Sequence, residues 1–419
     1  MIAIYGKWQI GTALKNLMDK LNIPNRLMDD DDADHKFLKA CNQIVVNPWI
    51  KPKHSIYKKY KKKIIWEFDF IRETLQENEM LQSFEFIWIT WTDGKSTTTW
   101  VVYNLFKELI SPSNNSIVWT WGTTDIPLSQ VVYQILENWR ENYNNIVIIE
   151  TSSFVWHNIK KFKFDYSIWL NFFADHLDWH VDAEEYFNSK TNIVKSTKHW
   201  AILWKTVIEK FGQKDNYDIE IQENNIDIWK TKFVGQHNLE NLSHAYSLIL
   251  KYIKDKELNI SSFDVLEKLY EIKPLSHRTE FIKQIWEIKI YDDGKSTTVQ
   301  NLKAWMQSFG EKLIIIAGGS DKWADFSELQ DIFAEKLNWA VLIWEAAKNM
   351  WEILKRSWVD YTITWNLQLA ITRAYEMAKK TKTKIILFSP WCASFDMFQN
   401  RLDRVEKFLD AIQVLEGKN

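Results

Sequence analysis

A short polar stretch, TWTDGKSTTT (residues 90–99), has the residue types of a phosphate-binding loop. It follows the apolar run FEFIWI and precedes residues at helical spacing, which is the context that such a loop requires. Backbone N–H groups at the helix start would hold phosphate oxygens. Lys95 would neutralise the phosphates, and Ser96 could bind Mg²⁺ through its hydroxyl. The strict spacing of the longer phosphate loop would need glycine at position 89, which is Ile89, so a polar turn that only caps a helix is the alternative.

Acidic and histidine residues follow two other apolar runs. Glu150 ends the run IVIIE, where a carboxylate beside the phosphate loop would suit Mg²⁺; an ordinary acid at a strand end is the alternative. The stretch NFFADHLDWH groups His176 with two acids and a second histidine, namely Asp175, Asp178 and His180. Because no cysteines accompany them, these residues favour a Mg²⁺ or substrate site over a zinc site.

Further candidates lie later in the chain. Lys190 has the setting of an ordinary exposed lysine on a helix, whereas Arg278 in HRTE follows a segment boundary, from which it could reach a phosphate. YDDGKSTT (291–298) has the form of a second phosphate loop, although it does not have to bind one. GGSDK and SPWCASFD end apolar runs, and loops at the carboxyl ends of strands form the ligand crevice of α/β domains.

The elements that must position these residues follow a regular order, in which short apolar runs alternate with stretches that have apolar residues at helical spacing. This pattern predicts an α/β fold with largely parallel sheets. It divides into three segments, 1–83, 84–273 and 274–419. Strands are expected at NSIVWT, NNIVIIETS, DYSIWLNFF and HWAILW in the second segment, and at WEIKIYDD, KLIIIAGGS, WAVLIW and KIILFSP in the third. The lysine-rich run in KPKHSIYKKYKKKIIWEFDF is interpreted as a solvated helix face.

Composition limits the class of protein. The net charge of -2 gives no reason to expect nucleic acid or an anionic membrane as partner. The cysteines, Cys41 and Cys392, are far apart, which fits a reducing compartment. The first residues lack the form of a signal peptide, and no apolar run approaches the ~20 residues of a membrane span. We therefore expect a soluble cytoplasmic protein without membrane insertion.

Glycine and tryptophan are present in abnormal numbers. There are 11 glycines where average usage predicts roughly 29, and 24 tryptophans. The tryptophans concentrate in turn-like stretches such as GKWQIG, NPWI and GGSDKWADF, where glycine is the usual residue. Our hypothesis is that UGA codons are read as glycine; a genuinely Trp-rich protein is the alternative. The hypothesis applies most directly to Trp8, Trp49, Trp88, Trp91, Trp119, Trp121 and Trp323, and least to Trp156, Trp179 and Trp305.

Taken in order, the motifs resemble those of the Mur ligase family over essentially the whole chain. The family pattern TGT(N/D)GKST matches residues 90–97, with Trp91 in the place of a glycine. The shorter family loop explains why the strict spacing fails. Other matching stretches are NPWI, ETSSF, HLDWH, GQHNLEN, HRTE, DGKST, GGSDKWADF and SPWCASFDMF.

The resemblance implies three domains: an N-terminal Rossmann-like UDP-binding domain (1–83), a central P-loop ATPase with a mostly parallel sheet (84–273), and a C-terminal Rossmann-like domain that binds the amino acid (274–419). Within the family, the motifs are most similar to those of the ligase that joins D-glutamate to UDP-N-acetylmuramoyl-L-alanine. The implied activity is ATP-dependent, passes through an acyl phosphate, and serves cytoplasmic peptidoglycan synthesis and thus cell shape and division. A monomer with two Mg²⁺ ions is expected.

The family's site residues carry over by motif. Lys95, His176, Lys190 and Arg278 are the implied catalytic residues. ATP is expected at Thr92, Asp93, Gly94, Lys95, Ser96, Thr97, Asn238, Asn241, Arg278 and Asp293, with Asp293 near the ribose. Mg²⁺ is expected at Ser96, Glu150, His176 and a carbamylated Lys190. Substrates are expected at Pro48, Trp49, Thr123, Thr297, Lys322, Ser394 and Phe395, with an acid among Asp29–Asp31 also near the UDP.

Several positions depart from the family pattern. Thr123 stands where many relatives have asparagine, Gly294 and Ser296 replace serine and alanine, and Arg401 lies where a bulky apolar residue often closes the amino-acid pocket. The amino acid is therefore less firmly implied than the reaction. Two alternatives remain open: another ligase of the superfamily, such as a folylpolyglutamate synthetase, and an inactive nucleotide-binding protein if the tryptophans are genuine.

Overall fold

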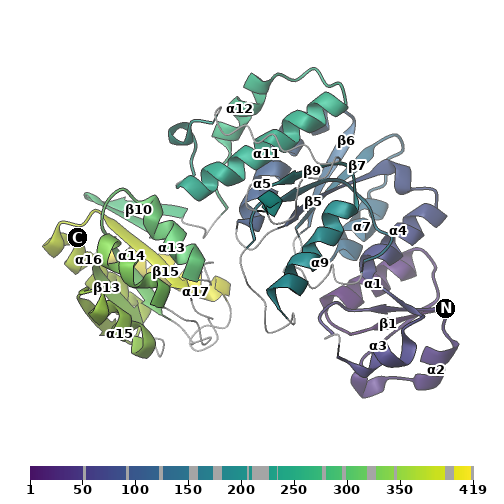
Figure 1. The fold of residues 1–419 in the computed structure, drawn as a ribbon, viewed down its shortest axis with the longest axis horizontal. Coiled ribbons are helices and arrows are strands. Elements are labelled where there is room, and N and C mark those ends of the chain that lie inside the picture. Colours follow the sequence, from purple (N-terminus) through teal and green to yellow (C-terminus); the bar gives the residue numbers. More distant parts are fainter. Residues whose placement is uncertain are drawn as a thin grey trace. The chain divides into compact units, whose positions relative to one another are not determined.

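The computed structural model contains three β-sheets among the residues that it describes (Figure 1). Contacts divide the chain into two compact units, Met1–Ile226 with Glu240–Ile272, and Asp227–Leu239 with Lys273–Asn419. The described residues are 1–50, 53–90, 94–121, 126–150, 159–172, 182–204, 207–209, 226–233, 235–275, 280–294, 299–318, 327–343, 347–391 and 401–416.

The first sheet is parallel and has the order β2-β1-β3-β4. In this order the connections leave β1 and β3 in opposite directions, and ligands of such sheets bind where the carboxyl ends of those strands meet. Its strands are β1 (Ile2–Tyr5), β2 (Asn25–Met28), β3 (Gln43–Val46) and β4 (Ile64–Ile65), and its helices are α1 (Gln9–Lys20), α2 (His35–Ala40) and α3 (Ser55–Tyr60).

The second sheet is also parallel, in the order β6-β7-β5-β8-β9. All four strands expected after the phosphate loop are present. The strands are β5 (Phe84–Thr90), β6 (Ser116–Trp121), β7 (Asn144–Glu150), β8 (Phe164–Trp169) and β9 (Thr197–Leu203). The associated helices are α4 (Glu67–Glu77), α5 (Lys95–Leu105), α6 (Ser111–Ser113), α7 (Leu128–Glu137), α9 (Ala183–Lys195), α11 (Gln236–Asp255) and α12 (Ser262–Glu271).

One hydrophobic core joins the first two sheets. Ile4 and Val45 of the first sheet belong to the same cluster of buried side chains as Phe86 and Val147 of the second. Helix α4 contributes to this cluster, and its Glu67 carboxylate accepts hydrogen bonds from the backbone N–H and hydroxyl of Ser129 in α7, at 2.9 and 2.7 Å. The first two sheets are therefore packed as one body.

The third sheet, β10-β11-β15-β12-β13-β14, is parallel except for the edge strand β10. The four strands expected here are confirmed, whereas β10 and β14 were not anticipated. The strands are β10 (Glu280–Ile285), β11 (Ile288–Asp292), β12 (Leu313–Gly318), β13 (Leu337–Ile343), β14 (Tyr361–Thr364) and β15 (Ile385–Trp391). The helices are α13 (Val299–Ser308), α14 (Gln330–Lys336), α15 (Ala347–Arg356), α16 (Leu367–Thr381) and α17 (Arg401–Glu416). The expected α/β architecture is thus confirmed.

Two tryptophans occupy backbone positions that favour glycine. Trp286 has a φ of 54° in the two-residue turn between β10 and β11, and Trp358 has a φ of 56° just after α15. Glycine is the usual residue at the first position of such hairpin turns and after helix ends. Both indoles are largely exposed, at 75% and 94%. By contrast, Trp305 is buried against His237, as an ordinary core tryptophan would be.

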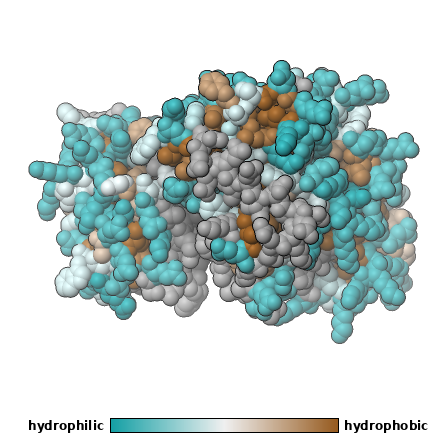
Figure 2. Space-filling view, turned by 45° about the horizontal axis from the view of Figure 1, so that its top comes forward, coloured by the Kyte–Doolittle hydropathy of each residue, from teal (hydrophilic) through white to brown (hydrophobic). Residues whose placement is uncertain are grey.

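Hydrophilic residues cover most of the described surface in the view of Figure 2. Among the described residues, none of the helices combines the length and apolar character needed to cross a bilayer.

Candidate active site

The expected phosphate loop leads from β5 to α5. β5 lies in the middle of its sheet and is almost entirely buried, and α5 begins at Lys95 directly after Gly94. Gly94 has a φ of 90°, and a Cβ atom on it would lie 2.7 Å from Oδ1 of Asn241. Glycine is therefore required here both by the left-handed backbone and by the neighbouring side chain.

Ser96 and Glu150 come together at the carboxyl edge of the second sheet. β7 lies beside β5, with Glu150 opposite Ile89 in the register. Oγ of Ser96, in the first turn of α5, donates a hydrogen bond to Oε1 of Glu150 at 3.1 Å. A hydroxyl and a carboxylate beside a phosphate loop are oxygen ligands of the kind that Mg²⁺ prefers, so this pair fits the implied metal.

Two asparagines of the GQHNLEN motif lie on α11. Asn238 and Asn241 are three residues apart, a spacing that places them on the same helix face, and both are buried. Asn241 is the side chain that lies beside Gly94. The structure therefore brings one of the two expected nucleotide contacts to the start of α5.

The beginning of α11 is fixed by His237. Its ring lies 4.1 Å from that of Trp305, with Nδ1 3.4 Å from the Ser308 hydroxyl. Burial lowers the pKa of His237 to about 4, so the imidazole is neutral at pH 7. These contacts hold the residues immediately before Asn238 against α13.

Lys190 is not the exposed lysine that its helical setting suggests; that interpretation is wrong. Its side chain is only 1% exposed, and Nζ lies 4.6 Å from the ring centre of Tyr186 and 6.0 Å from that of Phe172. The sequence signal that could have shown this is the aromatic residue one turn earlier on α9. The expectation from family resemblance, a metal-bridging carbamylated lysine, stays a prediction.

Asp293 lies at the carboxyl end of β11, beside β15. Its backbone N–H donates to the carbonyl of Phe388 at 2.7 Å, and its Oδ2 accepts a hydrogen bond from Oγ of Ser389 at 2.9 Å. Both Asp293 and Ser389 are buried. Ser389 was not singled out from the sequence, although it opens the SPWCASFDMF stretch.

The residues expected to lie near the UDP group follow the carboxyl ends of β1 and β3. A Cβ atom on Gly6 would lie 2.7 Å from Cβ of Asn47, so the turn after β1 touches the turn that contains Pro48 and Trp49. Oδ1 of Asn47 accepts from the backbone N–H of Trp49 at 3.1 Å, and the Trp49 indole is half exposed. The acidic run after β2 also reaches this point, because Asp29 accepts from the backbone N–H of Lys7 at 3.2 Å.

Other expected site residues lie outside the described residues and stay predictions. They are Thr92, Asp93, Thr123, His176, Arg278, Thr297, Lys322, Ser394 and Phe395.

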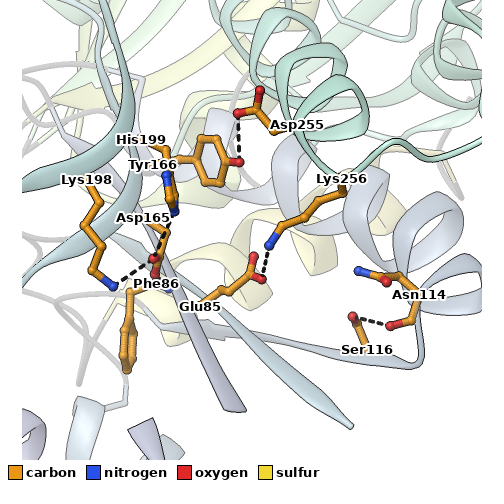
Figure 3. Close-up of polar contacts among 10 residues, drawn as sticks. All are labelled: Glu85, Phe86, Asn114, Ser116, Asp165, Tyr166, Lys198, His199, Asp255 and Lys256. Carbon is orange, nitrogen blue, oxygen red and sulfur yellow. Dashed lines mark hydrogen bonds and ion pairs between the residues drawn. The ribbon is translucent and has the colours of Figure 1, made fainter. Parts of the chain in front are cut away.

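A second polar cluster occupies the amino edge of the second sheet, opposite the carboxyl ends described above (Figure 3). Lys198 pairs with Asp165 at 2.9 Å, Lys256 pairs with Glu85, and the Tyr166 hydroxyl donates to Asp255 at 3.0 Å. Because each of these two lysines has a carboxylate partner, the cluster is explained by its internal ion pairs.

Known proteins resemble the chain over nearly its full length. The Mur ligase middle domain family matches residues 89–207. The UDP-N-acetylmuramoylalanine--D-glutamate ligase of Aquifex aeolicus (strain VF5) is 32% identical over 90% of this chain and 89% of its own length. The ligase of the same name from Hydrogenobaculum sp. (strain Y04AAS1) is 28% identical over 98% of both chains.

Solved structures share the fold at low sequence identity. UDP-N-acetylmuramate-alanine ligase MurC from Thermotoga maritima has a TM-score of 0.55 and 16% identity, with 99% of both chains covered. The folylpolyglutamate synthase of Mycobacterium tuberculosis complexed with ADP has a TM-score of 0.60 and 10% identity, over 96% of this chain and 98% of the synthase. The fold alone therefore does not distinguish these ligases from one another. The sequence likeness to the Aquifex enzyme does establish the family. The chain belongs to the Mur ligases.

Proposed function

We propose that the protein is an ATP-dependent ligase that joins D-glutamate to UDP-N-acetylmuramoyl-L-alanine in the cytoplasm. The observation that carries this proposal is the 32% identity to a ligase of that specificity over 89% of its length. The meeting of Gly94, Ser96 and Glu150 at the start of α5 supports nucleotide use. ADP in the related folylpolyglutamate synthase structure points to the same nucleotide.

A free carboxylate reacts poorly with an amine, and phosphorylation by ATP converts one of its oxygens into a leaving group. An oxygen of the terminal alanine carboxylate attacks the γ-phosphorus of ATP, and ADP leaves, which gives an acyl phosphate. The amine of D-glutamate then attacks the carbonyl carbon and loses a proton. The tetrahedral intermediate expels phosphate, so the products are the amide, ADP and phosphate.

The site must gather several negative charges for this transfer. The N–H groups at the start of α5 and the ammonium of Lys95 would hold the phosphates, because a helix N-terminus favours anions. Ser96 and Glu150 would hold Mg²⁺, which supplies positive charge against the phosphate oxygens. Asn241 would fix the loop at Gly94, where no side chain larger than hydrogen fits.

Three further parts of the site belong to this proposal. Lys190 would react with CO₂ to carry a carbamate towards a second Mg²⁺; its burial beside Tyr186 is compatible with a lysine that becomes an anionic ligand. Asp293, held by Ser389, would accept hydrogen bonds from the nucleotide ribose. The turns after β1 and β3 would receive the UDP group, in keeping with the strand order of that sheet.

ADP release in the presence of different acceptors tests the proposal. With UDP-N-acetylmuramoyl-L-alanine, ATP and Mg²⁺, we expect turnover with D-glutamate and none with L-glutamate, L-lysine or diaminopimelate. Turnover with a pteroate substrate instead would show a folylpolyglutamate-type ligase. The assay should include a chain with glycine at the recoding candidates, because absence of turnover in that chain would favour an inactive nucleotide-binding protein.

A further inference from the structure

A cavity of 670 Å³ in the first unit is lined by an unusual number of lysines. It lies where α3 and β4 meet the start of α4, and Lys160 and Lys161 join it from the segment before β8. The lysines that line it are Lys58, Lys61, Lys62, Lys63, Lys160 and Lys161, against the two acids Asp69 and Glu73. This volume falls within the range of about 300–1,000 Å³ that is typical of small-molecule sites.

Two of these lysines and both acids are already engaged. Nζ of Lys161 lies 2.6 Å from Glu73, and Nζ of Lys63 donates to the carbonyl of Cys41 at 2.8 Å. The buried carboxylate of Asp69 accepts three backbone N–H groups, those of residues 160–162, at 2.8 to 2.9 Å. These contacts fix the segment that carries Lys160 against α4.

The remaining four ammonium groups have no carboxylate partner among the described residues. They belong to Lys58, Lys61, Lys62 and Lys160, and all four side chains are exposed. The cluster at the amino edge of the second sheet differs from this cavity, because Lys198 and Lys256 there each form an ion pair with a carboxylate (Figure 3). Four like charges around one cavity repel each other, and an anion in the cavity would relieve that repulsion.

The cavity is separate from the candidate active site within the first unit. Lys160 and Lys161 precede the amino end of β8, and Gln43 is the first residue of β3. In these parallel sheets, Thr90 and Glu150 lie at the opposite, carboxyl ends of their strands. The lysines of the cavity therefore are not the ones that serve the phosphate loop.

We propose that this cavity binds a small molecule that carries several phosphate groups. Lysine acts as a point charge for phosphate, and four separate ammonium groups suit a ligand with charges spread over more than one group better than a single carboxylate. The site does not depend on the ligase activity, so either proposal can fail without the other.

Calorimetric titration with inorganic tripolyphosphate at low ionic strength, without Mg²⁺, tests this site. In a variant with Lys58→Gln, Lys61→Gln and Lys62→Gln, binding should weaken about tenfold, since exposed ion pairs contribute modestly one by one. The matched control, Lys36→Gln with Lys195→Gln and Lys254→Gln, removes three exposed lysines that lie outside the cavity, and its affinity should stay within about twofold of the parent. Equal affinities in the two variants would overturn the proposal.

The phosphate loop could also bind tripolyphosphate, so the same titrations are made with Lys95→Ala. Binding at the cavity should persist in that variant, and its complete loss would assign the ligand to the phosphate loop instead. Melting curves should show the cavity variant to be at least as stable as the parent, because like charges have been removed. A single-stranded oligonucleotide that binds these lysines more tightly than tripolyphosphate would contradict a small-molecule site.

Discussion

The Ser96 hydroxyl and the Glu150 carboxylate are two candidate metal ligands that the structure places in direct contact. Glu150→Gln keeps the shape of the side chain and removes its charge, so the variant should need at least about tenfold more Mg²⁺ for half-maximal ADP release. Glu137→Gln, on an exposed carboxylate at the end of α7, is the matched control and should behave like the parent. An unchanged Mg²⁺ requirement in Glu150→Gln would remove this residue from the metal site.

In the proposed site, Ser389 would be a positioning residue, because it would act through Asp293. Removing one hydrogen bond to a buried carboxylate costs roughly 1–3 kcal/mol, so Ser389→Ala should raise the KM for ATP about tenfold and change kcat little. The variant should also discriminate less between ATP and ATP analogues that lack a ribose hydroxyl. Ser357→Ala removes a buried hydroxyl that donates to the backbone carbonyls of Gln330 and Ile353, and it should leave the KM unchanged. A lower kcat at constant KM would contradict the role of Ser389.

At the scale of elements, the strand–loop–helix unit around Gly94 was the most predictable part of the molecule. The continuous apolar run predicted β5, a strand buried on both faces, and the small polar residues after it predicted the start of a helix, which is α5. Strands β10 and β14 were missed, since edge strands are half exposed and lack a continuous apolar run. The burial of Lys190 was missed because it depends on Phe172, which contacts it from another segment, as well as on Tyr186 of α9.

The start of α5 gives a direct test at this scale. Gly94→Ala would force a side chain into the left-handed backbone and against Asn241, so the free energy of unfolding should fall by about 1–2 kcal/mol and ATP binding should be lost. Gly310→Ala is the matched control, because a Cβ atom there meets nothing within 4 Å. Thermal unfolding and nucleotide titration measure both effects. Normal ATP binding by Gly94→Ala would mean that the loop does not hold phosphate in this geometry.

The two turns that carry Trp286 and Trp358 test the recoding hypothesis. Relief of the left-handed backbone should make Trp286→Gly and Trp358→Gly each more stable by about 1 kcal/mol. Trp229→Gly should give no such gain, since Trp229 is 93% exposed but lacks a positive φ. The gene should have UGA at codons 286 and 358, and peptide masses of the native protein should show glycine there. UGG codons at both positions would contradict the hypothesis.

For the whole molecule, the shared core of the first two sheets is the feature that sequence could not supply. Each sheet follows from its own apolar runs, but the contact between Glu67 of α4 and Ser129 of α7 joins residues 62 positions apart. The same limit applies to the candidate site. Single residues such as Lys95 and Glu150 could be named from motifs. The hydrogen bond from Ser389 to Asp293 could not be predicted, because it depends on the pairing of β11 with β15.

Glu67 makes the stability of this joined body depend on pH. Burial raises its pKa to about 7 from 4.5, so between these values the folded protein keeps a proton that the unfolded chain has lost. Its contribution to stability is therefore fully present below pH 4.5 and is lost as the pH rises through 7. As the pH rises from 4.5 to 8, the free energy of unfolding of Glu67→Gln should increase by roughly 3 kcal/mol relative to that of the parent. Denaturant unfolding measures this difference. Glu77→Gln, on an exposed position of α4, should keep the parent's pH dependence, and parallel curves for Glu67→Gln and the parent would contradict this account.

The fate of the carboxylate oxygen tests the central claim most directly. UDP-N-acetylmuramoyl-L-alanine labelled with ¹⁸O in its free carboxylate is incubated with the protein, ATP, Mg²⁺ and D-glutamate, and the products are analysed by mass spectrometry. The account predicts the D-glutamyl amide together with inorganic phosphate that carries one ¹⁸O atom, because that oxygen leaves with the phosphate of the acyl phosphate. Unlabelled phosphate, or ADP formed without the amide, would contradict it.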